Sequence, residues 1–373
     1  MPVYPNISKL ILQNFRNFEQ QKFVFNNSQI ILTGKNGCGK SNVLESLTML
    51  GRNPNLRGSD FDEMIKISQN SFNIFCEITN HDYIEKISLN FNIEQKKKNL
   101  AINSEPINQK RQSDLKNYQP NFIFLTPQLE QLFISGKSNR RDYLDRIVSD
   151  IDLLHQTRLN NYQKLLKERL IILQKYHAQS NSLKWLDAIE AKIVESGIAI
   201  ASARIEAVEF FNKAIKSFAS NFPPITLQAI GEIEQAVMKQ SSLQIENLYS
   251  EKLKQNRQTD SENFKTNFGI HRGDFEAIFC PKNISAIFSS TGEQKAIMIA
   301  LTIARAKISA QYRNQMTILI FDEIVSHLDE KRKVDLLNEI FETQLQSFFS
   351  ATDFNHIPKA LRNNFSEIKI DEL

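Results

Sequence analysis

Residues 34–41, GKNGCGKS, narrow the possible folds of this chain more than any other segment does. They fit the pattern G-x-x-x-x-G-K-[ST], directly after the apolar segment QIILT (29–33) and before NVLESLTML (42–50). A strand, a glycine-rich turn and a helix in this order form a phosphate-binding loop, because backbone N–H groups at a helix N-terminus can surround an anion. The segment therefore predicts an α/β sheet with a nucleotide at the edge of the sheet.

Each residue type in this loop suits a nucleoside triphosphate. The glycines let the backbone wrap the β-phosphate, Lys40 reaches the β- and γ-phosphate oxygens, and the Ser41 hydroxyl can hold Mg²⁺. We expect the nucleotide to contact the whole loop: Gly34, Lys35, Asn36, Gly37, Cys38, Gly39, Lys40 and Ser41.

A second motif, TILIFDE at 317–323, supplies the acidic residues of such a site. Its continuous apolar run predicts a buried parallel strand, and α/β proteins bind ligands at the C-terminal end of such strands. We expect Asp322 to bind Mg²⁺, directly or through water, and Glu323 to be the catalytic general base for a water that attacks the γ-phosphate. GTPases and kinases would not need this pair of carboxylates here.

A third segment, STGEQ at 290–294, is a small polar turn that leads into a helical pattern. In isolation it is an ordinary helix cap, a serine with glutamate three residues later. It precedes the ILIFDE strand by about 30 residues, as in ABC-type ATPases, where such a turn on one head caps the γ-phosphate held by another head. The residues expected to contact a neighbour's nucleotide are Ser290, Gly292, Glu293 and Gln294.

Three further positions complete the expected site. Asp329 in SHLDE (326–330) is expected to touch the dimer seam and the nucleotide, with a helix N-cap as the alternative. Gln128 in FIFLTPQLEQL is a candidate Mg²⁺ ligand, with an exposed loop glutamine as the alternative. Thr352 and Asp353 stand where many ABC proteins have a switch histidine, so the residue with that role is left unassigned.

The middle of the chain has a different texture. From 137 to 222 it has no proline and one glycine, and apolar residues recur at helical spacing. We expect two long helices, 143–176 and 183–218, followed by a polar helical stretch up to Gly269. The expected domains are 1–125, the first part of an ATPase head; 126–268, a helical arm; and 269–373, the rest of the head.

Composition sets looser limits. The net charge of +4 is compatible with a local nucleic-acid face without establishing one. Cys38, Cys76 and Cys280 are scattered, so neither a disulfide framework nor a zinc site is supported. The chain shows no apolar run of membrane-spanning length and no signal peptide, so we expect a cytoplasmic protein.

These motifs together resemble the RecF family, a recombination mediator with an SMC-like ABC ATPase head. The resemblance runs nearly end to end, through LILQNFRNF, ILTGKNGCGKSNVLESL, LTPQLEQLFISGKSNRRDYLDRIV, GIHRGDFE, STGEQKAIMIALTIARA and ILIFDEIVSHLDEKR. Some loop positions depart from the family pattern: Gln128 replaces a usual glutamate, Ile270 replaces a proline, and a second proline is absent near Ser138.

The resemblance implies an α/β fold, a P-loop ABC/SMC-like ATPase head with an inserted α-helical arm. It also implies an ATP- and Mg²⁺-dependent homodimer that binds double-stranded, gapped or junction-containing DNA, hydrolyses ATP slowly, and helps RecO and RecR to load RecA on single-stranded DNA. The cellular roles that follow are DNA replication, recombination, DNA damage repair and the SOS response.

Arginines are the side chains most suited to DNA phosphate contact. The candidates are Arg57, Arg140 and Arg141, although the last two could equally form salt bridges with Asp142 or Asp145.

Two other classes share part of the pattern. In transporter ATPases the capping turn follows the phosphate loop by roughly a hundred residues, whereas here the gap is about 250 residues. A nuclease with a Toprim domain needs an Asp-x-Asp at a strand end, but Asp150 and Asp152 lie in a predicted helix.

Overall fold

The structure, a computed structural model, describes residues 5–51, 60–79, 84–106, 119–175, 180–312 and 316–370. The chain divides into two compact units. The first comprises Met1–Glu130, Ser220–Phe222 and Met298–Leu373, and the second comprises Gln131–Ala219 and Pro223–Ile297. In the described part of the chain, no helix combines the length and the apolar character that crossing a membrane requires.

An antiparallel sheet in the first unit has the strand order β2-β1-β4-β5-β6-β7. Alternation of apolar and polar residues predicts such half-buried strands, and in β4 the side chains of Phe72, Ile74 and Cys76 are buried while those between them are not. The strands are β1 (Asn6–Phe15), β2 (Phe18–Val24), β4 (Ser71–Thr79), β5 (Ile84–Asn92), β6 (Lys97–Ile102) and β7 (Glu105–Pro106).

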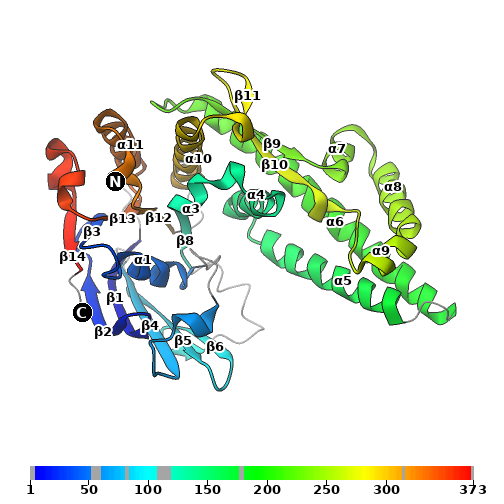
Figure 1. Cartoon of the computed structure of the whole chain (residues 1–373), viewed down its shortest axis with the longest axis horizontal. Helices are drawn as coiled ribbons and strands as arrows, with labels where there is room; N and C mark the ends of the chain where they lie inside the picture. Colours follow the sequence, from blue (N-terminus) through cyan, green and yellow to red (C-terminus); the bar gives the residue numbers. More distant parts are fainter. Residues whose placement is uncertain are drawn as a thin grey trace. The chain divides into compact units, whose positions relative to one another are not determined.

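A parallel sheet in the same unit has the order β14-β3-β13-β12-β8, and all its neighbouring strands run parallel (Figure 1). Four of the strands are buried along their whole length, as is usual for a parallel sheet that is covered on both faces. The strands are β3 (Gln29–Thr33), β8 (Asn121–Leu125), β12 (Thr317–Asp322), β13 (Gln346–Ala351) and β14 (Ser366–Lys369). Their carboxyl ends share one edge, so the loops after β3, β8, β12 and β13 gather there.

One apolar core joins the two sheets of the first unit. It includes Phe15 of the antiparallel sheet, Phe348 of the parallel sheet, and Leu44 of helix α1 (Lys40–Thr48). Helix α11 (Glu330–Thr343) lies in the same unit, whereas α10 (Thr291–Tyr312) begins in the second unit and ends in the first. The core holds α1 and the strand before it in place, which positions the loop between them.

The second unit consists mainly of helices (green to yellow in Figure 1). The expected single helix over 143–176 is wrong, because the chain breaks at 152–154. Asp152 has an extended backbone, and its carboxylate accepts a hydrogen bond from the Leu154 N–H at 3.0 Å. A side chain that binds nearby backbone competes with helix formation. The helices are α4 (Lys137–Ile151), α5 (His155–Lys175), α6 (Ser180–Ser217), α7 (Glu232–Lys239), α8 (Ser242–Gln255) and α9 (Arg257–Asn263).

The second unit also contains a small sheet of order β11-β10-β9. The prediction of a helical stretch up to Gly269 is therefore wrong for β9 (Ile225–Ile230), which pairs antiparallel with β10 (Asp274–Phe279). Strand β11 (Ile284–Ser285) pairs with the other edge of β10. Because β10 pairs within this unit, residues 269–297 group with the helices, whereas we expected the head to resume at 269.

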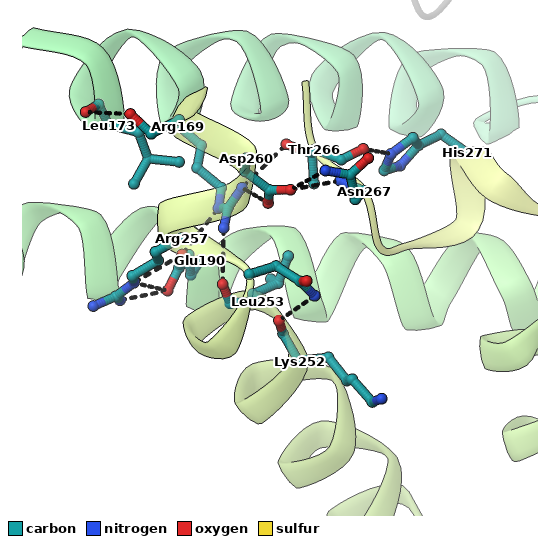
Figure 2. Close-up of polar contacts among 12 residues, drawn as sticks. Arg169, Leu173, Glu190, Lys252, Leu253, Arg257, Asp260, Thr266, Asn267 and His271 are labelled. Carbon is teal, nitrogen blue, oxygen red and sulfur yellow. Dashed lines mark hydrogen bonds and ion pairs between the residues drawn. The ribbon is translucent and has the colours of Figure 1, made fainter. Parts of the chain in front are cut away.

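Two buried arginines connect the helices of the second unit. Arg169 on α5 donates to Glu190 Oε1 on α6 at 2.9 Å and to Asp260 Oδ2 on α9 at 2.6 Å (Figure 2). Arg204 on α6 binds both carboxylate oxygens of Asp145 on α4 at 2.9 and 2.8 Å. A buried charge requires such partners, because desolvation without them is strongly destabilising. The pairs fix how these helices pack against one another.

Candidate nucleotide-binding site

The predicted phosphate-binding loop connects β3 to α1, in the expected order of strand, loop and helix. Lys35, Asn36 and Gly37 form its exposed tip, whereas Cys38 is buried. Lys40, the first residue of α1, is only 4% exposed, and its Nζ donates to the carbonyl oxygens of Gly34 at 2.7 Å and Lys35 at 2.9 Å. The ammonium group is thus held over its own loop.

Two glycines of this loop have no room for a side chain. Gly34 has a φ of +151°, and a Cβ there would approach the Ile370 carbonyl oxygen to 2.3 Å. Gly39 has a φ of +109°, and its Cβ would lie 2.8 Å from the Phe18 ring. Left-handed backbone favours glycine, and here the neighbouring chain excludes every other residue as well. The pattern of glycines in the motif therefore has a steric cause.

Asp322 lies at the end of β12 beside the first turn of α1. Its Oδ1 accepts hydrogen bonds from Ser41 Oγ at 3.0 Å and from Ser350 Oγ at 2.6 Å. Among the described residues no group of three or more His, Cys, Asp and Glu side chains is placed to hold a metal. The donor set nevertheless fits Mg²⁺, which takes oxygen ligands and is held by one or two carboxylates, water and substrate phosphates.

Glu323, one residue beyond β12, has a left-handed backbone with φ 59° and ψ 3°. Its N–H donates to Ser350 Oγ at 2.8 Å. A non-glycine residue in this region is uncommon and is held there by its surroundings, often at functional sites. Ser350 on β13 therefore positions both acidic residues, although the sequence analysis did not single it out.

Other predicted residues follow strands at the same edge of the sheet. Gln128 is exposed in α3 (Pro127–Glu130), directly after β8, which is the neighbour of β12. Thr352 and Asp353 follow β13, which lies between β3 and β12. Thr352 Oγ1 is 3.1 Å from His356 Nε2. A histidine is thus present near this edge, four residues after Thr352.

The predicted capping turn, residues 290–294, forms the start of α10: Ser290 precedes the helix, and Thr291 is its first residue. Ser290 and Gly292 are exposed, and a Cβ at Gly292 would have no neighbour within 4 Å. Gln294 is buried, and its Nε2 donates to the carbonyl oxygens of Ala286 at 2.9 Å and Ser289 at 3.1 Å. The amide of Gln294 therefore holds the backbone of the turn and is not presented to a ligand.

Asp329 is the N-cap of α11. Its carboxylate accepts a hydrogen bond from the Arg332 N–H at 2.9 Å. The side chain is also exposed, so the cap that was the alternative for this residue is present and leaves the carboxylate accessible. A contact of Asp329 with a second subunit stays a prediction.

The three arginines that are candidates for DNA contact differ in their surroundings. Arg140 is buried and binds both oxygens of Asp274 at 2.8 and 2.7 Å, so its guanidinium forms a salt bridge within the chain, and its contact with DNA stays a prediction. Its partner is Asp274 rather than the nearby acids of its own helix, because β10 packs against α4. Arg141 is half-buried and donates to the Gly273 carbonyl at 3.0 Å. Arg57 lies outside the described residues.

Comparison with known proteins extends over nearly the whole chain. Residues 6–371 match the family described as RecF/RecN/SMC N terminal domain. The DNA replication and repair protein RecF of Rickettsia prowazekii (strain Madrid E) is 33% identical over 351 residues, which cover 94% of this chain and 95% of that protein. RecF of Rickettsia felis (strain ATCC VR-1525 / URRWXCal2) is 32% identical, with 94% of each chain covered.

Solved structures agree on the fold. A structure of the recombination mediator protein RecF with ATP, in the RecFOR pathway, matches with a TM-score of 0.84 at 23% identity and covers 96% of this chain and 95% of that one. An SMC head bound to the C-winged helix domain of ScpA matches with a TM-score of 0.54 at 15% identity, covering 97% and 94%. The predicted fold class, a P-loop ATPase head of the ABC/SMC type with an inserted helical arm, is confirmed.

Proposed function

The chain belongs to the RecF family of DNA replication and repair proteins, and on that basis we propose that it is an ATP-driven switch that binds DNA as a homodimer. The observation that carries this proposal is the cluster of Lys40, Ser41 and Asp322 at one edge of the parallel sheet. The transporter and nuclease alternatives have no such support, because the match to RecF extends over 94% of the chain.

In the proposed site ATP lies on the loop between β3 and α1. Lys40 exchanges its two carbonyl contacts for β- and γ-phosphate oxygens, which are stronger acceptors because they carry charge. Ser41 and Asp322 would hold Mg²⁺, whose bound charge offsets that of the phosphates. Gln128, in the short helix α3 that follows the adjacent strand β8, is proposed as a further ligand.

Hydrolysis is assigned to Glu323. Its carboxylate accepts a proton from the water that attacks the γ-phosphate, and the Ser350 contact fixes the backbone from which it projects. We propose that turnover is slow, since the chain uses ATP to change its association state rather than to drive continuous work. The energy for that change comes from differential binding, because ATP can shift a monomer–dimer equilibrium only if it binds the dimer more tightly.

The dimer is proposed to form around nucleotide. The hydroxyl of Ser290 and the N–H of Gly292 donate to the γ-phosphate held by the neighbouring head, at the helix N-terminus where the dipole favours an anion. Asp329 is proposed to lie at the same seam. DNA binding by the closed dimer strengthens ATP binding and is strengthened by it, since coupling between two ligands is reciprocal. Cooperation with RecO and RecR in loading RecA is part of this proposal.

Replacement of Ser290 by arginine tests the trans contact. We expect the variant to bind ATP on its own loop and to remain a monomer, because the bulky cation displaces the γ-phosphate donor. Ser241→Arg is the matched control: Ser241 also forms a capping box, with Gln244, but at the start of α8 in the helical unit. Each variant loses about 1 kcal/mol of capping. Sedimentation with Mg-ATP measures the outcome, and ATP hydrolysis at the normal rate by monomeric Ser290→Arg protein contradicts the two-head site.

A further inference from the structure

Ser290, one of the two residues proposed to donate to the γ-phosphate, is already hydrogen-bonded within the chain. The hydroxyl and the N–H of Ser290 donate to the same carboxylate oxygen, Glu293 Oε2, at 2.9 and 2.8 Å. The other oxygen, Oε1, is 2.5 Å from Lys282 Nζ. The proton that a γ-phosphate needs from Ser290 is therefore donated to a carboxylate one turn along the same helix.

Lys282 reaches this carboxylate from the hairpin between β10 and β11. Its N–H donates to the Phe279 carbonyl at 3.2 Å, and the next N–H, of Asn283, donates to the Cys280 carbonyl at 3.2 Å. These bonds fix the backbone of the lysine, while its side chain is 60% exposed. The ammonium group of Lys282 thus lies at the surface, near the N-terminus of α10.

The charges decide what an arriving phosphate encounters. The hydrogen bond from Lys282 and those from Ser290 lower the pKa of Glu293 to about 2, so the carboxylate is ionised at neutral pH. An unpaired carboxylate at this point would repel a triphosphate and would compete with it for the Ser290 donors. Lys282 cancels that charge and offers a second contact that can hold the carboxylate once Ser290 is released.

We propose that Lys282 is a positioning residue of the nucleotide site that two heads form together. Lys282 neutralises Glu293, and it holds the Glu293 carboxylate when Ser290 donates to the partner's γ-phosphate instead. The exchange conserves hydrogen bonds, because phosphate oxygens replace Oε2 as acceptor while Oε1 stays on the lysine. The inference rests on the proposed function, since it needs a nucleotide from a second head. It adds to the proposed nucleotide site a basic residue, Lys282, that lies outside the STGEQ segment.

A purely structural pair would behave differently. If the ion pair of Lys282 and Glu293 only holds the hairpin against the helix, then substitution of either residue loosens the turn. Each substitution would then weaken dimer formation. If Lys282 acts through the charge of Glu293, then removal of that charge makes the lysine dispensable. The two roles therefore predict opposite signs for Glu293→Gln, which keeps the capping geometry because glutamine also serves at this position.

The experiment compares Lys282→Met, Lys282→Arg, Glu293→Gln and the Lys282→Met/Glu293→Gln double variant in the full chain. Sedimentation with Mg-ATP gives the dissociation constant of each dimer, and circular dichroism checks the fold. We expect Lys282→Met to weaken the dimer about tenfold, because it leaves a like charge beside the phosphate. Lys282→Arg should stay within about twofold of the unmodified protein, since the charge is kept.

Glu293→Gln and the double variant distinguish the proposed role of Lys282 from a purely structural one. Glu293→Gln should tighten the dimer about threefold, because it removes the carboxylate that competes with the phosphate for Ser290, and the double variant should recover most of the loss of Lys282→Met. Weakening by Glu293→Gln equal to that of Lys282→Met, without recovery in the double variant, overturns the proposal. Ser290→Arg distinguishes failure of the proposed function from failure of the Lys282 proposal. If this variant still dimerises with ATP, the contact between Ser290 and the partner's nucleotide is wrong, independently of the results for Lys282.

Discussion

Lys40→Ala is expected to abolish ATP binding at concentrations that saturate the unmodified protein. In the proposed site the buried ammonium exchanges its two carbonyl contacts for phosphate oxygens, and loss of these charge-assisted bonds should raise the dissociation constant for ATP by about a hundredfold or more. Titration with a fluorescent ATP analogue measures this directly. Lys22→Ala, an exposed lysine on β2, is the control for loss of one positive charge.

Retained affinity in Lys40→Ala would contradict the assignment of the phosphate loop. A matching loss in Lys22→Ala would show that net charge, rather than the loop, governs binding. The substitution shortens a side chain whose acceptors are carbonyls of its own loop, so the fold should remain and circular dichroism should be unchanged.

Glu323→Gln is expected to reduce ATP turnover by about 10²–10³-fold and to leave ATP binding intact. Glutamine keeps the size of the side chain and the backbone contact with Ser350, but it cannot accept the proton of the attacking water. Since hydrolysis is then blocked after closure, the ATP-bound dimer should persist. Single-turnover hydrolysis and sedimentation measure the two effects.

Glu94→Gln, on the exposed turn after β5, is the control for removal of a carboxylate. Turnover that is unchanged in Glu323→Gln would remove this residue as the base. Turnover that is lost together with ATP binding would indicate damage to the β12 end instead.

Much of the fold could be predicted because the signals are local. Strand β3 matches the predicted segment 29–33, since a continuous apolar run indicates burial on both faces of a sheet. Parts that depend on distant partners could not be predicted. Strand β9 is six residues long and is stabilised by β10, which follows about 45 residues later. The helix break at Asp152 could not be predicted either, because it depends on a hydrogen bond from the Leu154 N–H to the Asp152 carboxylate.

The site divides in the same way. The strand–loop–helix order, which is visible in sequence, predicted where Lys40 and Ser41 lie, and the apolar run before Asp322 predicted that this residue ends a buried strand. Ser350 was not identified, since a serine in a buried strand acquires its role only from the pairing of β12 with β13. The motif also could not show that Gln294 faces inward or that Arg140 is bound by Asp274.

The central claim is that ATP is bound between two copies of this chain. The most direct measurement is the solution mass of the full chain by sedimentation, with and without Mg-ATP and before DNA is added. The account predicts a monomer without nucleotide and a dimer with it. A constant monomer mass with ATP demonstrably bound would contradict it, because the capping turn would then have no neighbour's phosphate to contact.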